Sequence, residues 1–300
     1  MAGSTGEVLK SLAVNAVIAT SKGIAAAMTG SGALLAETLH SFADCGNQLL
    51  LLVGIKRSAR PPSPKYPLGQ GREMYFYSFV VALLLFSGGG VFSVYEGIHK
   101  LKHPEKVGNI TVGLVILGLS ILLEGWSTWG NLKEMKKRRK DKPLLKYLRD
   151  SKDSDLIVVF GENSAAVFGL VLALLSLIVA KQTNDGRWDA IGSIAIGVVL
   201  VGVALFLARE IKSLLVGEAA DPELEAAMKQ LAVDDPNVDE MLRLLTVQQG
   251  PGEIVVAAKL RFRAGLDTKQ LVDAINGFER ELKKRVPEVR WSFIEPDHTD

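Results

Sequence analysis

Two ionisable side chains stand four residues apart in an apolar segment near the start of the chain. They are His40 and Asp44, in Ala36-Glu-Thr-Leu-His-Ser-Phe-Ala-Asp44. Four residues is slightly more than one helical turn, so a helix places both side chains on one face about 6 Å apart. An imidazole and a carboxylate so placed can both bind one Zn²⁺, at distances of about 2.0–2.2 Å. The spacing therefore favours a metal site over the alternative, a hydrogen bond between the two residues that holds the helix in a bundle.

A further carboxylate, Glu162, lies in the apolar run Gly161-Glu-Asn-Ser-Ala-Ala166. An ionisable group inside a membrane span is costly and needs a cation, a proton or a polar partner. Two interpretations of Glu162 are open: it binds a metal ion, or it pairs with Lys22 in the first apolar run. Glu124 presents a similar choice between relaying protons and pairing with a basic side chain.

Six apolar runs contain these residues. A helix needs roughly 20 apolar residues to cross a hydrocarbon core of about 30 Å. The chain has 300 residues, of which 48% are hydrophobic, and its long apolar runs end near residue 215. Gly88, Gly89 and Gly90 in the third run suit close helix packing or a bend. We predict six membrane-spanning helices, at about 8–29, 32–55, 74–99, 109–131, 154–180 and 187–215.

The distribution of charge bears on orientation and partners. Basic residues cluster between the second and third predicted spans and between the fourth and fifth. Because cytoplasmic loops carry an excess of Lys and Arg, and because six is an even number, we expect both termini in the cytoplasm. The net charge of +2 gives no overall basic field for binding nucleic acid. The single cysteine, Cys45, excludes an intramolecular disulfide and a four-cysteine zinc site.

The pattern changes after Gly217 to short amphipathic elements. We expect a helix over 222–232, strands near 241–248 and 253–263, a helix near 271–282 and a last strand near 289–293. Gly250-Pro-Gly252 predicts a hairpin turn between the first two strands. The predicted domains are therefore a six-helix transmembrane domain at 1–215 and a small α+β domain, with the order α-β-β-α-β, at 216–300. The second domain carries no catalytic constellation.

Three segments resemble one family of membrane proteins. Thr29-Gly-Ser-Gly-Ala-Leu-Leu-Ala-Glu-Thr-Leu-His-Ser-Phe-Ala-Asp44 is similar to the second-span signature of the cation diffusion facilitators. Asp189-Ala-Ile-Gly-Ser-Ile-Ala-Ile-Gly197 resembles their sixth span, and Pro67-Leu-Gly-Gln-Gly-Arg-Glu73 resembles their loop after span two. Glu162 followed by small residues resembles the mitochondrial-type zinc transporter subgroup. The likeness extends over nearly the whole chain.

The resemblance implies a fold, a location and a ligand set. It implies six spans, a homodimer, a cytoplasmic metallochaperone-like domain, and exchange of a divalent metal for protons. We expect the membrane to be a bacterial inner or plasma membrane. The family takes two metal ligands from span two and two from span five, each pair four residues apart. His40 and Asp44 match the first pair, and Glu162 matches the first member of the second.

The chain departs from the family pattern at two places. The fourth ligand position falls on Ala166, which cannot bind a metal, so Asn163, a water or Glu37 is expected to complete the shell. Open zinc sites with three protein ligands make such a shell reasonable. Where many members have histidines after span two, this chain has Tyr66 and Gln70, and no metal is expected there.

These observations together predict a proton-coupled antiporter that exports divalent cations, with Zn²⁺ expected, by alternating access. Metal and protons compete for the same ligands, because ligands must be deprotonated. No prosthetic group and no enzymatic activity are expected, since a membrane metalloenzyme would need a motif such as His-Glu-x-x-His, and the sequence has none. Two alternatives stay open. One is an exporter of Mn²⁺, Fe²⁺ or Co²⁺, which the same ligands suit, and the other is a transport-inactive scaffold or metal sensor, because Ala166 removes a ligand.

Overall fold

The computed structural model describes residues 2–103, 108–139, 143–144, 147–148 and 154–299. The chain divides into two compact units. The first comprises Met1–Ile55, Phe76–Leu148 and Asp155–Ile211, and the second comprises Lys56–Tyr75, Arg149–Ser154 and Lys212–Asp300. The expected domain division at 215/216 stays a prediction. Much of the basic segment between the predicted fourth and fifth spans lies outside the described residues.

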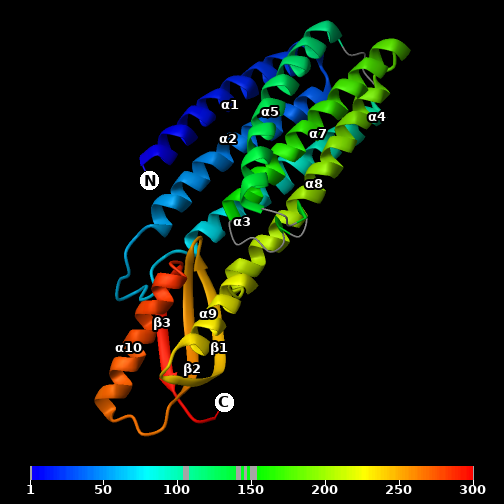
Figure 1. Ribbon diagram of the computed structural model, residues 1–300. Coiled ribbons are helices and arrows are strands. Elements are labelled where there is room, and N and C mark those ends of the chain that lie inside the picture. Colours follow the sequence, from blue (N-terminus) through cyan, green and yellow to red (C-terminus); the bar gives the residue numbers. More distant parts are fainter. Residues whose placement is uncertain (1, 104–107, 140–142, 145–146, 149–153, 300) are drawn as a thin grey trace. The chain divides into compact units, whose positions relative to one another are not determined.

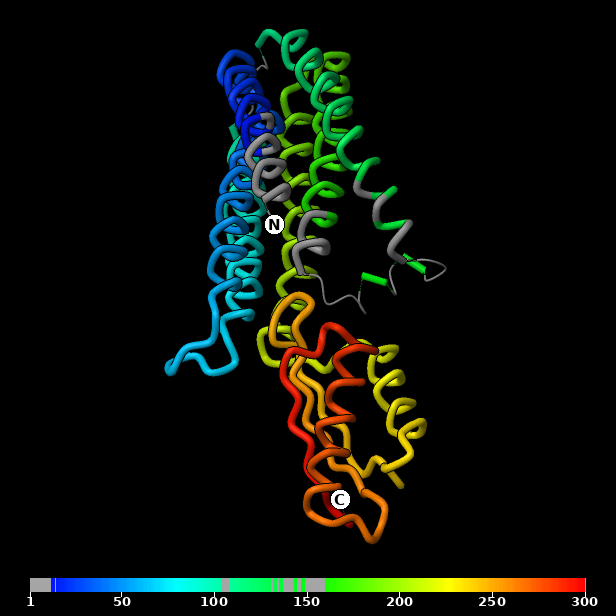
Figure 2. The backbone as a smooth tube through the Cα atoms, turned by 60° about the vertical axis from the view of Figure 1, so that its left-hand side comes forward, coloured from blue at the N-terminus to red at the C-terminus, as the bar shows by residue number. Residues whose placement is uncertain are grey.

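The first unit is a bundle of long helices that run side by side (Figures 1 and 2). Helix α3 continues through a π-helical segment, η1, directly into α4. The helices are α1 (Ala2–Thr29), α2 (Gly32–Ser58), α3 (Glu73–Leu84), η1 (Leu85–Val91), α4 (Phe92–Lys102), α5 (Ile110–Arg139), α7 (Ser154–Thr183) and α8 (Arg187–Val216). Each of the six apolar runs recognised in the sequence therefore lies on a helix.

Among the described residues, four helical stretches are long and apolar enough to cross a membrane. They are Glu73–Lys102, Ile110–Gly130, Phe160–Thr183 and Arg187–Val216. Helices α1 and α2 have 28 and 27 residues, which is sufficient length. The physical reason that α2 falls short is the set of polar side chains along it, including Glu37, His40 and Asp44. Four spans are thus supported by length and composition, and six remain a proposal.

The bundle buries several charged and polar side chains and leaves many large apolar side chains exposed. Lys22, Glu37 and His40 have no exposed surface, whereas Leu122 and Phe168 are 70% and 64% exposed. Water-soluble proteins seldom bury charged side chains completely or expose broad apolar surfaces. Hydrocarbon around the bundle would cover such apolar surface, and the interior partners would satisfy the polar groups.

Glycines allow the η1–α4 segment to pack against the backbone of α8. A Cβ at Gly90 would lie 3.0 Å from the Val201 amide nitrogen, and one at Gly97 would lie 2.8 Å from the Ala190 carbonyl oxygen. A Cβ at Gly88 would meet nothing within 4 Å. The expected close packing of the triple-glycine run is therefore confirmed at Gly90, and Gly88 takes no part in it.

The second unit contains a three-stranded sheet in the order β1-β2-β3. Strands β1 and β2 are antiparallel, and β3 pairs with β2 in parallel after the crossover helix α10. Its elements are α9 (Pro222–Asp234), β1 (Val238–Gly250), β2 (Glu253–Phe262), α10 (Thr268–Arg285) and β3 (Val289–Pro296). The expected α-β-β-α-β order is confirmed, and Gly252, with φ of 68°, occupies the hairpin turn.

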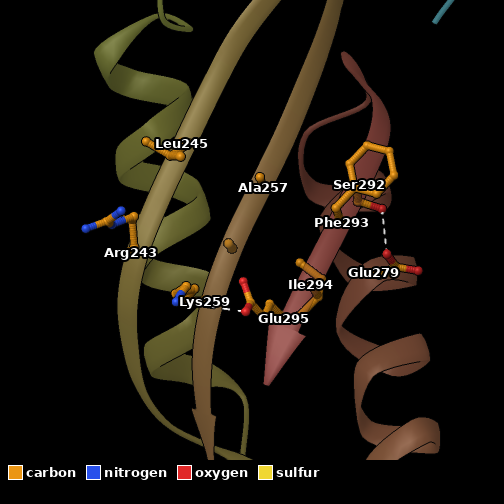
Figure 3. A pocket seen from close by; sticks show the side chains of 10 residues that line it. Arg243, Leu245, Ala257, Lys259, Glu279, Ser292, Phe293, Ile294 and Glu295 are labelled. Carbon is orange, nitrogen blue, oxygen red and sulfur yellow. Dashed lines mark hydrogen bonds and ion pairs between the residues drawn. The ribbon is translucent and has the colours of Figure 1, made fainter. Parts of the chain in front are cut away.

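One face of this sheet carries the core. Alternate residues of β2 point to it, and they pack with Met228 and Leu231 of α9 and with Phe278 and Leu282 of α10. The core residues of β2 are Ile254, Val256, Ala258, Leu260 and Phe262. The other face holds a shallow pocket lined by side chains from all three strands, with Arg243, Leu245 and Phe293 among them (Figure 3).

Candidate metal site

Helix α2 presents a stripe of polar side chains to the interior of the bundle. Glu37, His40, Ser41, Asp44 and Asn47 recur at intervals of three or four residues, which is the spacing of one helical face. Four of them are buried, and the Asp44 side chain is 18% exposed. The sequence interval that pointed to His40 and Asp44 is therefore part of a longer polar face.

His40 and Asp44 are close together but not hydrogen bonded. His40 Nδ1 and Asp44 Oδ1 are 3.6 Å apart, which is beyond hydrogen-bond range. Both ring nitrogens of His40 and Oδ1 of Asp44 are buried without a hydrogen-bond partner. Two ligands of a tetrahedral Zn²⁺ lie about 3.4 Å apart when each bond is about 2.1 Å. The separation and the unpaired atoms thus fit one divalent ion between them, and the alternative of a self-satisfied pair is wrong.

Glu162 of α7 is held by a residue that the sequence analysis did not single out. Asn47 Nδ2 donates a short hydrogen bond to Glu162 Oε1, and both side chains are buried. Asn47 follows Asp44 by three residues and His40 by seven, so helical periodicity was the signal that could have identified it. The bond positions the Glu162 carboxylate at the Asn47 end of the polar stripe.

The contacts of α2 with α7 show which part of α7 faces the pair. Asn47 meets Glu162, whereas Glu37 lies against Gly169, where an added Cβ would overlap the Glu37 carboxylate. The two helices are therefore antiparallel here. His40 and Asp44 fall between these contacts, on the level of α7 that contains the buried Ala166.

The four residues expected to bind metal are brought together only in part. The carboxylates of Asp44 and Glu162 lie near enough for a charge on one to oppose a charge on the other. Asn163 is half-buried, and no described contact joins it to the other three. Within the described part of the chain, no three His, Cys, Asp or Glu side chains already converge on a metal-sized site. The ligand set His40, Asp44, Glu162 and Asn163 stays a prediction.

Lys22 does not form an ion pair with Glu162 among the residues that the structure describes. In the described contacts its ammonium group bonds to Glu37 of α2 and Glu124 of α5. The interpretation that paired Lys22 with Glu162 is therefore wrong, and the interpretation that paired Glu124 with a basic side chain is confirmed. Glu162 keeps Asn47 as its partner.

An aspartate of α8 fixes the start of α2. Ser31 Oγ donates to Asp189 Oδ1 at 2.5 Å, and the Gly32 amide donates to Asp189 Oδ2 at 2.6 Å. The first amides of a helix have no partner within it, so a carboxylate at this position stabilises the helix start. Lys100 of α4 also donates to the Gly30 carbonyl oxygen. Helices α4 and α8 thereby set the position of the polar stripe along the bundle.

The single histidine of the second unit lies beside a carboxylate that is already occupied. Asp297 accepts hydrogen bonds from Lys259 Nζ at 2.8 Å and from the His298 amide at 2.7 Å. These bonds, led by that from Lys259, lower the pKa of Asp297 to about 2. The carboxylate therefore closes the end of β3 onto β2.

Comparison with known proteins identifies the family. Residues 8–216 match the model described as the cation efflux transmembrane domain. The chain belongs to the cation efflux family. The family resemblance seen in the sequence is therefore confirmed. The matched residues include the whole polar stripe of α2. They also include residues of all the long helices of the bundle, and relatives named proton-coupled zinc antiporters are transporters rather than enzymes.

Individual relatives extend the likeness beyond the membrane region. The Xenopus laevis protein named proton-coupled zinc antiporter SLC30A9, mitochondrial, is 31% identical over 290 residues, which cover 94% of this chain and 52% of the relative. The Homo sapiens protein of that name is 26% identical over 327 residues, covering 96% and 58%. Metal tolerance protein C4 of Arabidopsis thaliana is 30% identical over 241 residues, covering 80% and 51%. The chain thus spans about half the length of these relatives.

Proposed function

We propose that this cation efflux protein is a proton-coupled antiporter that exports Zn²⁺ from the cytoplasm by alternating access. The observation that carries the proposal is the pair His40 and Asp44, whose ligand atoms are buried, 3.6 Å apart at their nearest and without hydrogen-bond partners. Relatives named proton-coupled zinc antiporters support both the ion and the coupling.

The proposed roles follow from the contacts. His40 and Asp44 supply a nitrogen and an oxygen ligand from α2. Glu162 supplies a third ligand from α7, and its carboxylate is oriented by the hydrogen bond from Asn47. Asn163 or a water completes the shell. A histidine with carboxylates also suits Mn²⁺, Fe²⁺ and Co²⁺, so the preferred ion is part of what the experiment decides.

The proposed coupling follows from competition at the ligands. Metal binding requires deprotonated groups, so a metal ion and protons exclude each other from one site. When the site faces the cytoplasm, metal binds and protons leave. When it faces a more acidic compartment, protonation releases the metal. Movement of helices around a fixed site then gives alternating access. A homodimer in a bacterial inner or plasma membrane, with both termini in the cytoplasm, belongs to the same proposal.

The test is metal flux in proteoliposomes under an imposed pH gradient, with Zn²⁺, Mn²⁺, Fe²⁺ and Co²⁺ compared. We expect gradient-dependent Zn²⁺ flux for the wild type and a loss of at least about tenfold for His40→Ala, equal to about 1.4 kcal/mol of binding or barrier. His103→Ala, which changes an exposed ring at the end of α4, serves as the matched control and should keep its flux.

Other outcomes have defined meanings. Faster flux of another ion would replace Zn²⁺ as the substrate. Absence of flux for every metal, from protein that is folded and inserted, would contradict transport and favour a scaffold or metal sensor. The mass of the purified protein in detergent, measured by light scattering, tests the homodimer separately.

A further inference from the structure

A second cluster of charges lies beside the metal pair, on the same face of α2. Lys22 of α1 is fully buried. Its Nζ donates hydrogen bonds to Glu124 Oε1 of α5 at 2.7 Å, to Ser41 Oγ at 2.9 Å and to Glu37 Oε2 at 3.3 Å. One ammonium group therefore bonds to three oxygens from two neighbouring helices, and Ser41 directly follows the proposed ligand His40.

The surroundings of this ammonium resemble a cation site made of oxygen atoms. Glu37 Oε1 and Glu124 Oε2 are buried and accept no hydrogen bond. Two carboxylates face a single positive charge, so the cluster has more acceptor capacity than Lys22 uses. Carboxylate and hydroxyl oxygens are the donors that hard divalent cations such as Mn²⁺ and Mg²⁺ prefer.

The position of Glu37 is enforced by packing. Its carboxylate lies against Gly169 of α7, where a side chain would overlap it. Glu37 is also fully buried, so it cannot turn toward solvent. Residues of α1, α2, α5 and α7 therefore meet around the buried Lys22 ammonium group and its two carboxylate partners.

We propose that Lys22 is a built-in cation that occupies a second carboxylate site, Glu37–Ser41–Glu124, and thereby restricts the bundle to one divalent ion at His40 and Asp44. A covalently attached ammonium is always present at high effective concentration, so it excludes a free ion that the same oxygens would otherwise bind. The number of ions bound by the wild type rests on the proposed function, whereas binding at the second site is tested without it.

The test counts bound metal on the purified full chain in detergent by equilibrium dialysis, with Mn²⁺ and Zn²⁺ as probes. All variants carry His40→Ala, which removes the first site. Adding Lys22→Ala opens the pocket and should add one bound ion per chain. Lys22→Met removes the charge but fills the space, so it should add none, as should Lys22→Arg. Adding Glu37→Gln and Glu124→Gln to Lys22→Ala should remove the gained ion.

The outcomes of this binding test separate a cation site from a purely structural role of Lys22. If folded His40→Ala/Lys22→Ala protein binds no more metal than His40→Ala alone, Lys22 only joins three helices and the proposal is overturned. If that variant does not fold without metal, its thermal unfolding in the presence and absence of Mn²⁺ decides instead. The proposal requires Mn²⁺ to stabilise this variant but not the Lys22→Met variant, and an equal effect on both would overturn it. Absence of metal from the wild type, with a gain in Lys22→Ala, would instead contradict the proposed function alone.

Discussion

At the scale of single residues, the proposed metal site differs from a four-ligand shell at Ala166. This residue is 5% exposed and lies on the level of α7 that faces His40 and Asp44. Its methyl group supplies no electrons to a metal. Three protein ligands bind a metal less tightly than four, and weaker binding favours release of a transported ion.

Ala166→Asp should therefore add the missing ligand. We expect Zn²⁺ to bind on the order of tenfold more tightly, which is about 1.4 kcal/mol, and flux to fall because release becomes slower. Competition against a zinc-binding dye measures the affinity. Ala166→Leu, which fills the same space without a ligand atom, should not tighten binding, and equal affinity of the Asp and Leu variants would place Ala166 away from the metal.

Residue spacing alone predicted the pair on α2, because the helical repeat relates His40 to Asp44 without any other element. The partners across helices could not be predicted in this way. Lys22 lies 102 residues from Glu124, and Asn47 lies 115 residues from Glu162. Which of several buried cations and carboxylates meet depends on how the helices pack, and a single sequence carries no direct signal of that.

At the scale of elements, α2 is long enough to cross a membrane and also carries a polar stripe on one face. The six apolar runs predicted the long helical segments of the bundle, and strand alternation with the Gly250–Gly252 turn predicted the sheet. The π-helical segment η1 was not predicted, because its Gly-rich sequence is compatible with either a bend or close packing. The structure shows that Gly90 has a packing partner whereas Gly88 has none.

The two glycines make a matched pair of substitutions. Gly90→Ala should destabilise the bundle by about 1–3 kcal/mol, since the new methyl group overlaps the α8 backbone. Gly88→Ala should be neutral or stabilising by up to about 1 kcal/mol, because alanine favours the helical backbone. Thermal unfolding of the detergent-purified variants measures both. Equal midpoints for the two variants would contradict the close contact at Gly90.

The end of β3 has a defined dependence on pH. The folded-state pKa of Asp297, about 2, is below its ordinary value of 3.8. The carboxylate therefore stabilises the folded sheet above pH 4, and this contribution disappears as the pH falls toward 2. Asp297→Asn should loosen β3 at pH 7, and the difference from wild type should shrink below pH 4.

Hydrogen–deuterium exchange of the β2–β3 segment, corrected for the intrinsic rate at each pH, measures this effect in the full chain. Lys259→Met removes the main cause of the lowered pKa and should reproduce the Asn variant. A constant difference between wild type and Asp297→Asn from pH 7 to pH 3 would show that Asp297 does not titrate as the contacts require.

At the scale of the whole molecule, the chain joins a bundle that buries a polar stripe and exposes many apolar side chains to a unit whose core is apolar. Each unit is suited to its own solvent. Helices α1 and α2 are not among the four apolar stretches of the described residues, since their polar residues lower their average hydropathy. Interior partners for Lys22 and Glu37 remove the main objection, so we expect six spans.

Cysteine accessibility tests this topology in a Cys45→Ser background, since Cys45 is the single cysteine. Cysteines at positions 63 and 298 should react with an impermeant maleimide from the cytoplasmic side. Cysteines at positions 28 and 184, near the α1–α2 and α7–α8 turns, should react from the opposite side. Cytoplasmic labelling at position 28 would show that α1 and α2 do not cross.

The capping of α2 by Asp189 has a consequence for biosynthesis. Asp189 is 157 residues later in the chain than the Gly32 amide that it accepts from. At a synthesis rate of about 5–20 residues per second, α2 waits roughly 8–30 s for this partner. During that interval Ser31 Oγ, which accepts from the Leu34 amide at 3.1 Å, is the local cap. The cap at the start of α2 is therefore completed only after α8, the last helix of the bundle, has been synthesised. Helix α8 is thus the last element to stabilise the hairpin of α1 and α2.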